Sequence, residues 1–472
     1  MNILSHITGL FQRKVVRNFS YITFSNVLVQ LLSLLSNIKI IRVLGPESYG
    51  VYAFILSQYL LFSTISLFGI RNIQIRNISR GTQKTKKQLV SAFFIQIIGF
   101  SISIALFFIY DALVGSVCRN YLFLFILCIV FNNLWDIIES IWYGYQKMLI
   151  PSLLNVCLMF VWAVTIFILP IDKFSITNLL LIFTLLLFLK FFILLIFTFY
   201  HKLLKGKIDG LFNEIISIVK ESAPLYLTVL VSLPTNYLSN NFLDIRSSER
   251  ELGYFNANNK LIQPLITLIN LAVIAIFPNL SNSWKLQNKE EFFLKIEKGL
   301  KLFVIIFSLF AVIISLLKVE LVSLLFGADF ISVANVVMYQ VWFVVIFGLN
   351  GIIGMIWIAV NRQSLVARYS ILNSLIATPL LWFGSKYGAE GLSISYFVAY
   401  LSFFPILWYQ FYKTMDKKIH LTREFAFLFL LMCFSLLIPK ELLLLIRICC
   451  IIFIFVITYF LFGKSIISFL KK

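Results

Sequence analysis

Long, almost uninterrupted runs of apolar residues dominate this chain and decide what it can fold into. Each is long enough to cross the hydrocarbon core of a bilayer, which takes about 20 residues of helix. The runs are continuous rather than alternating in polarity, so they predict helices and not barrel strands. We expect fourteen crossings, at residues 20–44, 48–70, 88–110, 121–143, 149–170, 176–200, 215–241, 252–280, 301–325, 331–360, 364–385, 389–412, 422–438 and 442–463.

Composition supports the same conclusion. Hydrophobic residues make up 60% of the 472 residues and charged residues only 13%, whereas a soluble domain has about half and a quarter. The 50 phenylalanines would not all find room inside a soluble protein of this size. The sequence therefore predicts an all-α polytopic membrane protein with about 14 transmembrane helices and no sizeable soluble domain.

Basic residues concentrate in every second connection between these runs. They occur in the N-terminal segment and, among other places, in the connections at 71–87, 202–207, 285–301 and 413–423. Because cytoplasmic loops retain Lys and Arg, these connections are predicted to be cytoplasmic, as are both termini. This topology explains much of the net charge of +20 without a nucleic-acid partner, and the remaining basic groups suit anionic lipid.

Polar side chains interrupt three of the apolar runs at helical spacing, so that they share one face of each helix. They are Asn26, Gln30 and Asn37 in the first run, Asn132, Asp136 and Glu139 in the fourth, and Asn256, Lys260, Gln263 and Asn270 in the eighth. An unpaired polar group in hydrocarbon is costly, so each stripe must face protein or water. Two interpretations stay open, namely hydrogen bonds between helices and the lining of an aqueous path.

Two further cations lie within predicted crossings. Lys190 lies about 15 Å from the inner end of the sixth crossing, at a depth similar to that of Asp136. We therefore expect Lys190 to pair with Asp136 or Glu139, either as a structural clamp or as an element that couples protons or cations. Arg447 lies near the end of the last crossing, so we expect it to snorkel outward.

Sequence signals for catalysis or for a cofactor are missing. The three histidines lie at the predicted cytoplasmic side, the cysteines show no metal-ligand spacing, and no nucleotide-binding motif occurs. We expect no enzyme activity, no cofactor and no metal site. Prolines in the later crossings, such as Pro224 and Pro379, predict bent helices of the kind found in transporters.

Several short motifs together resemble a known family. Residues 42–52 read R-V-L-G-P-E-S-Y-G-V-Y, in which Gly45 and Pro46 would close a tight turn. Three further segments also resemble motifs of this family, namely W-Y-G-Y-Q-K at 142–147, E-L-G-Y-F-N-A at 251–257 and L-F-G-A-D-F at 325–330. By these motifs the chain resembles the polysaccharide transporter family, the Wzx-type flippases of O-antigen and capsule repeat units.

The resemblance implies a MATE-like fold of the MOP superfamily, with two six-helix lobes related by a pseudo-two-fold axis. The implied divisions are a cytoplasmic N-terminal segment at 1–19, an N-lobe at 20–200, a C-lobe at 201–412, and two additional helices with a short cytoplasmic tail at 413–472.

The resemblance also implies a function. The family's substrate is an undecaprenyl-pyrophosphate oligosaccharide, moved by alternating access from the inner to the outer leaflet of the bacterial cytoplasmic membrane. Its other partners would be membrane lipids and, in the same pathway, the polysaccharide polymerase and chain-length regulator. The polar stripes and Lys190 would then line the cavity, with amides on the sugar hydroxyls. Lys260, and Arg42, Arg71 and Lys220 at the mouths, would offset the diphosphate charge.

Three other functions are alternatives to a flippase, and the sequence bears on each of them differently. A multidrug exporter of the same superfamily could use Asp136 and Glu139 to bind cationic drugs. A polysaccharide polymerase or ligase is also polytopic, but would need a large external loop, and the longest predicted here is about ten residues near 241–251. A scaffold without transport activity would not require the polar stripes.

Overall fold

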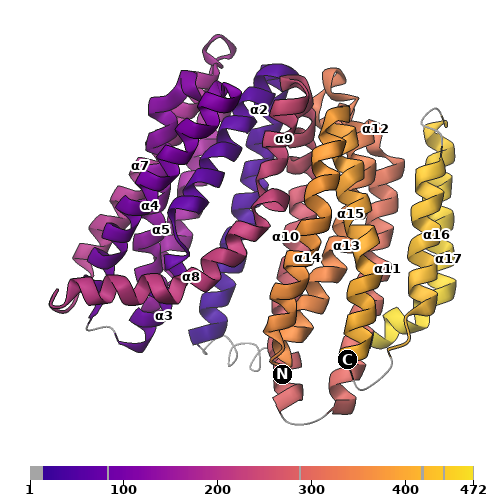
Figure 1. Cartoon of the computed structure of the whole chain (residues 1–472). Coiled ribbons are helices and arrows are strands. Elements are labelled where there is room, and N and C mark those ends of the chain that lie inside the picture. Colours follow the sequence, from indigo (N-terminus) through magenta and orange to yellow (C-terminus); the bar gives the residue numbers. More distant parts are fainter. Residues whose placement is uncertain (1–13, 82–83, 286–288, 416–418, 439–441, 471–472) are drawn as a thin grey trace, which may run out of the picture. The chain divides into compact units, whose positions relative to one another are not determined.

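The computed structural model describes residues 14–81, 84–285, 289–415, 419–438 and 442–470, and within these ranges the chain contains helices and no strand. Its contacts divide it into two compact units, Met1–Asn241 and Phe242–Lys472, which are described separately below (Figure 1). Most of the predicted N-terminal segment and the last two residues of the predicted tail lie outside the described residues.

The first unit consists of long helices joined by short connections. Its α-helices are α2 (Lys14–Ser66), α3 (Ile70–Arg80), α4 (Thr85–Val114), α5 (Leu122–Gly144), α6 (Leu149–Ile168), α7 (Ile176–Tyr200) and α8 (Leu211–Asn236), with 3₁₀ turns η2 (Val117–Tyr121) and η3 (Ile171–Lys173). The boundary between the units falls within α9 (Leu238–Arg246).

The element α2 contains the first two predicted crossings. A straight helix of its 53 residues would be about 80 Å long, well beyond the thickness of a bilayer. Gly45 interrupts it with φ 71° and ψ 174°, followed directly by Pro46. Only glycine adopts this conformation readily, so the predicted turn at Gly45 and Pro46 is confirmed, and α2 consists of two spans.

Two amphipathic segments of this unit lie where the sequence predicts a connection or a crossing. In α3, Ile70, Ile73 and Ile78 are buried, whereas Arg76 is half-buried and Arg80 is exposed. The first part of α8 crosses the ends of α3 and α4, as Figure 1 shows, and α8 bends by 52° between Pro224 and Val229. A search for long apolar runs misses helices like α3, because polar and charged residues separate its isoleucines.

The second unit is built in the same way. Its α-helices after α9 are α10 (Glu249–Lys285), α11 (Lys289–Leu316), α12 (Lys318–Phe326), α13 (Val333–Ala359), α14 (Gln363–Gly384), α15 (Gly388–Thr414), α16 (Thr422–Leu437) and α17 (Leu444–Leu470), with 3₁₀ turns η4 (Ala328–Phe330) and η5 (Ser385–Tyr387). Its most covered helix is α13, in which Trp342 and Trp357 are almost completely buried.

Indole hydrogen bonds fix neighbouring helices around α13. Trp342 Nε1 donates to Ser435 Oγ of α16 at 2.8 Å, and Trp357 Nε1 donates to Thr414 Oγ1 of α15 at 3.1 Å. A buried indole N–H needs a partner, so each tryptophan specifies one neighbour as well as filling space. The helices at the C-terminal end are therefore an integral part of the second unit.

The predicted number of crossings agrees with these helices. Nine helices of the described ranges are long and apolar enough to cross a membrane, or ten when the bent α8 is included. Two of the nine, Ser20–Ser66 and Gln363–Thr414, each combine two arms. The shorter α16 and the more polar α10 complete the fourteen predicted arms. The chain is a multi-pass membrane protein.

The predicted lobes follow a different criterion from the compact units. The predicted lobe boundary at residue 200 follows the sixth helix, whereas the contacts divide the units at residue 241. The difference concerns α8, which packs on α3 and α4 of the first unit. The predicted lobe boundaries and their pseudo-two-fold relation stay predictions.

Candidate functional site

The acidic face of α5 forms the centre of a charged cluster in the first unit. Asp136, Glu139 and Tyr143 follow one another at helical spacing and therefore share one face. Glu139 is 5% exposed and Asp136 19%, and the Tyr143 hydroxyl is hydrogen-bonded to Glu139. Two carboxylates at this depth require a cationic partner.

That partner is Arg71 of α3. Its Nη2 forms a hydrogen-bonded ion pair with Glu139 Oε2, and its Nε lies 3.9 Å from Asp136 Oδ1. The guanidinium carbon is 5.4 Å from the centre of the Tyr143 ring. Because the Arg71 side chain is 38% exposed, the pair has one open side and one covered side.

Lys190 of α7 lies on the same α5 helix but contacts an aromatic ring. Its Nζ is 4.1 Å from the centre of the Trp135 ring, a favourable cation–π geometry. Lys190 interacts electrostatically with Glu139 and Asp136, yet among the described residues no ion pair joins it to either carboxylate. The predicted neighbourhood is confirmed, whereas the predicted direct pair is wrong because Arg71 occupies that position.

Together these groups form what we call the α5 cluster: Arg71, Trp135, Asp136, Glu139, Tyr143 and Lys190. It contains two cations and two carboxylates, so it is neutral when all four are ionised. A balanced set of charges is far less costly to bury than a single one. The cluster therefore holds α3 and α7 against α5 and has no excess charge for a ligand.

The polar stripe of the first arm of α2 is only partly used for packing. Asn37 is buried and donates to Ser33 O at 2.7 Å on its own helix. Asn26 is exposed and Gln30 half-buried, and neither makes a hydrogen bond within the described part of the chain. Their hydrogen-bonding groups are therefore free within the described ranges, and their place in a cavity stays a prediction.

Asn132 of α5, in contrast, belongs to a layer of interhelical hydrogen bonds. Its Nδ2 donates to Ser63 Oγ of α2 at 3.0 Å. The neighbouring Asn133 donates to Ser66 Oγ at 2.8 Å, and Gln96 of α4 donates to the same hydroxyl. For Asn132 the structure therefore favours the packing interpretation.

In the second unit, the stripe on α10 contains a charge that has no partner among the described residues. Asn256 is buried and donates to Leu252 O at 2.9 Å, whereas Gln263 and Asn270 are exposed. Lys260 is half-buried, and in the described ranges its ammonium has neither an ion-pair partner nor a hydrogen bond. An unpaired lysine within a span needs water or an anionic ligand.

The predicted mouth residues differ in their environment. Arg42, before the turn at Gly45, and Lys220, on the first part of α8, are both exposed. Arg71, the third, belongs to the α5 cluster rather than to an open mouth. Neither the mouth assignments nor the cavity assignments are tested by these positions alone, so they stay predictions.

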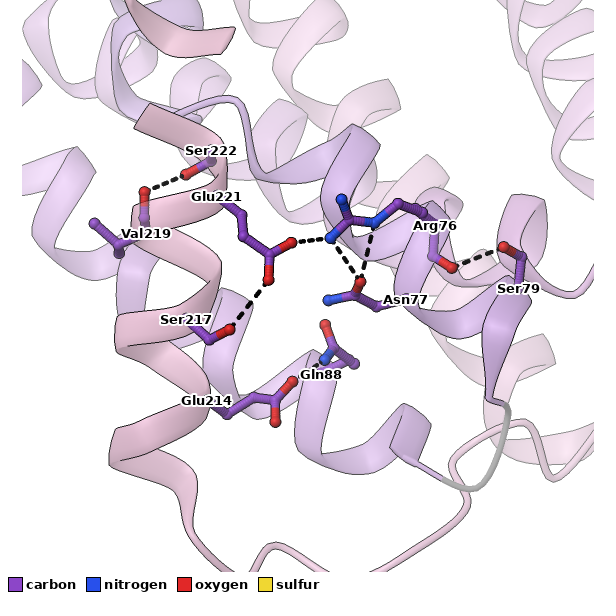
Figure 2. A network of polar contacts seen from close by, with 9 residues as sticks. All are labelled: Arg76, Asn77, Ser79, Gln88, Glu214, Ser217, Val219, Glu221 and Ser222. Carbon is purple, nitrogen blue, oxygen red and sulfur yellow. Dashed lines mark hydrogen bonds and ion pairs between the residues drawn. The ribbon is translucent and has the colours of Figure 1, made fainter. Parts of the chain in front are cut away.

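Sequence analysis missed a polar network that joins α3, α4 and α8 (Figure 2). Arg76 of α3 pairs with Glu221 of α8, which also accepts from Ser217 Oγ at 3.1 Å. Glu214 of α8 accepts from Gln88 of α4 and lies 2.9 Å from Lys87 Nζ. The sequence signal was the acidic spacing on an amphipathic helix, at Glu214 and Glu221.

Arg447 corrects another prediction. It does not snorkel outward, because both its Nη atoms contact Glu320 of α12, at 3.0 Å and 2.5 Å. It also donates to Leu316 O at 2.9 Å and Leu442 O at 3.0 Å. A bidentate carboxylate near the helix end is a stronger partner than water for a guanidinium. Arg447 fixes α17 to α11 and α12.

Neither unit offers a set of metal ligands, since no group of three or more His, Cys, Asp or Glu in the described ranges could hold an ion. The described polar groups instead comprise amides, paired charges and cations such as Lys260. Such groups can bind hydroxyls and anions, and they do not form a recognisable catalytic arrangement.

Comparison with known proteins identifies a family for this chain. The sequence profile of the polysaccharide biosynthesis protein family matches residues 15–284. A search of curated proteins finds no match.

Solved structures give the fold. The lipid II flippase MurJ, in an inward closed conformation, aligns with a TM-score of 0.70 at 17% identity, covering 94% of this chain and 99% of that one. An inward-facing multidrug resistance MATE family transporter of the MOP superfamily aligns at 0.60, with 14% identity and coverage of 82% and 96%. The Vibrio cholerae MATE transporter VcmN in its bent form aligns at 0.54, with 14% identity and coverage of 84% and 96%.

These matches cover almost the whole of each transporter, so the similarity is one of complete folds. The family profile covers more than half of the 472 residues, and the resemblance inferred from the motif at residues 42–52 is confirmed. This protein belongs to the polysaccharide biosynthesis protein family and has the fold of the MOP-superfamily transporters.

Proposed function

We propose that the protein is a flippase for undecaprenyl-pyrophosphate-linked oligosaccharide repeat units of O-antigen or capsule. It would move them by alternating access from the inner to the outer leaflet of the bacterial cytoplasmic membrane. Family membership supports a role in polysaccharide synthesis, and the resemblance to a lipid II flippase supports a fold that suits a lipid-linked cargo.

One observation supports an anionic cargo in particular. Asp136 and Glu139 interact with Arg71, whereas Lys260 has no anionic partner within the described ranges. The unbalanced charge is therefore positive. A diphosphate entering the bilayer loses its hydration, and an unpaired ammonium would offset part of that loss. Exposed amides such as Asn26 and Gln263 would accept hydrogen bonds from sugar hydroxyls and donate hydrogen bonds to them.

The same observation weighs against a multidrug exporter that binds cationic drugs. Such a site would need free carboxylates, and those of the α5 cluster are balanced by Arg71 and Lys190. A polymerase would need a large external loop, whereas residues 238–246 form helix α9 and residues 249–285 form α10. Neither alternative is favoured by an observation of its own.

Orientation and partners belong to the same proposal. Both termini would be cytoplasmic, and the polymerase and the chain-length regulator would receive the flipped units. Cysteines placed at Ser247 and at Lys289 would test the orientation with an impermeant thiol reagent. Labelling of the first from outside and of the second only from inside is expected, and the reverse pattern would refute it.

The function is tested by deletion of the gene in its host, followed by analysis of lipid-linked repeat units. Accumulation at the inner leaflet supports flipping, whereas single repeat units on the cell surface would indicate a polymerase. Lys260→Ala should reduce surface polysaccharide at a normal protein level. Lys173→Ala, at an exposed position in η3, is the matched control and should leave it unchanged.

A further inference from the structure

Two equally buried glutamines of the first unit differ in how they are satisfied. Gln58 is 0% exposed and exchanges two amide hydrogen bonds with Asn241, at 2.8 Å and 3.3 Å. Gln74 of α3 is 1% exposed, and neither its Oε1 nor its Nε2 has a hydrogen-bond partner among the described residues. Buried amides are rarely left in this state, so Gln74 requires an explanation.

Its position is fixed by the apolar residues on either side along α3. Ile73 belongs to a cluster with Ala92 of α4 and Ile137 of α5, and Ile78 belongs to a second cluster with Ile141 of α5. Gln74 shares this buried face of α3. It therefore lies between the two clusters, at the junction of α3 with α4 and α5.

Helix α4 brings further unsatisfied oxygens to this junction. Ser91 directly precedes Ala92, is 0% exposed, and its Oγ has no hydrogen-bond partner in the described part of the chain. Gln88 lies one turn earlier on the buried face of α4, and its Oε1 is likewise without a partner there. Gln74 of α3, together with Ser91 and Gln88 of α4, thus supplies both hydrogen-bond donors and hydrogen-bond acceptors without partners among the described residues.

The polar atoms extend from the α5 cluster to Glu214 in the first turn of α8. Arg71 lies one turn from Gln74 on α3, pairs with Glu139, and makes no hydrogen bond through its Nε. At the other end, Gln88 donates through its Nε2 to Glu214, as Figure 2 shows. Glu214 is only 17% exposed and is paired with Lys87.

We propose that Gln74 and Ser91 bind ordered water at the junction of α3, α4 and α5, and that this water connects the Arg71–Glu139 pair with Glu214. Water suits these groups because it both donates and accepts, and a buried water typically makes about three hydrogen bonds. A cation would suit them poorly, since Arg71 and the amide Nε2 present donors. The site would give the carboxylates of the α5 cluster aqueous access at the α8 end.

Radiolytic hydroxyl-radical footprinting of the full chain tests the water directly, because radicals formed from bound water oxidise adjacent side chains. Ile73 and Ile78 should be oxidised several-fold faster than Ile305 and Ile353, which are as well buried in the second unit. Equal, slow oxidation of all four would overturn the proposal. This readout needs no substitution and no transport assay, so it stands independently of the proposed function.

Thermal unfolding of Gln74→Leu gives a second test, because the direction in which the midpoint temperature shifts distinguishes a hydrated junction from a dry one. If water is bound, the substitution removes the hydrogen bonds of that water and the midpoint temperature falls. If the junction is dry, it removes an unsatisfied amide and the midpoint rises, which would overturn the proposal. Gln58→Leu is the matched control, because losing the paired amide should lower the midpoint in either case.

Discussion

The two units place charge within the membrane in opposite ways. The first unit collects Arg71, Asp136, Glu139 and Lys190 in one cluster, in which each carboxylate interacts with Arg71. The second places Lys260 on α10 without a partner in the described ranges, and its ion pairs, such as Arg447–Glu320 and Lys301–Glu297, lie on other helices. Paired charges can stabilise contacts between helices, whereas an unpaired charge in a span needs water or an anionic ligand as its partner.

This contrast predicts that loss of a charge is costly in the first unit and inexpensive at Lys260. The substitutions below follow in order of expected loss of stability, from the largest to none. All can be measured as free energies of unfolding, or as unfolding midpoints, of the full chain in detergent.

The largest loss is expected for Arg71→Met. It leaves Glu139, 5% exposed, without its cation, and breaking a buried pair in this way costs about 3–5 kcal/mol. The lower end applies here, because Arg71 itself is partly exposed. Adding Glu139→Gln should recover much of the loss, since it removes the uncompensated charge.

Arg76→Met is the matched control for Arg71→Met. Both arginines lie on α3, with side chains 38% exposed, and both pair with a glutamate. Glu221, the partner of Arg76, is 41% exposed, so we expect little change. Equal losses for the two arginines would contradict the importance of the buried cluster.

A smaller loss is expected for Glu320→Gln in the second unit. Arg447 is 9% exposed and would lose its carboxylate, but it keeps the carbonyls of Leu316 and Leu442. A hydrogen bond to a charged group contributes about 1.5–3 kcal/mol, and we expect a loss near the middle of that range. Glu297→Gln, which removes a partly exposed partner of Lys301, should cost less than about 1 kcal/mol.

Lys190→Met should reduce stability by about 1 kcal/mol, because it removes a cation–π contact but leaves both ion pairs of Arg71 intact. Lys190→Arg should retain most of the contact. An exchange of charge between Lys190 and Asp136 should not restore stability, since Asp136 lies beside Arg71. Full recovery in the double variant would show that Lys190 and Asp136 are direct partners.

The sequence was sufficient to predict the helices and the family. Continuous apolar runs locate spans because the backbone must satisfy its own hydrogen bonds in lipid, and the turn at Gly45 follows from residues that permit no alternative. Helix α3 was missed because it is only 11 residues long and contains several arginines, so it forms no apolar run. Its buried residues Ile70, Ile73 and Ile78 nevertheless have helical spacing.

Partners of buried charges were harder to predict than their positions. The similar depth of Lys190 and Asp136 within their predicted crossings correctly placed the two residues near each other. It could not show that α3 folds back and brings Arg71 closer to Asp136. The prediction that Arg447 snorkels outward was wrong for a similar reason, since its partner Glu320 lies 127 residues away in the sequence. Such pairings depend on which helices adjoin, and hydrophobic periodicity alone does not determine this.

Lys260→Met should leave stability unchanged or slightly increased, within about 0.5 kcal/mol. Its ammonium makes no ion pair or hydrogen bond within the described ranges, so its removal breaks no interaction, and methionine retains the length of the stem. Arg447→Met is the control, because it removes a cation of the same unit that is buried and paired. A loss for Lys260→Met as large as that for Arg447→Met would mean that Lys260 has a structural partner. It could then not be the free charge on which an anionic cargo depends.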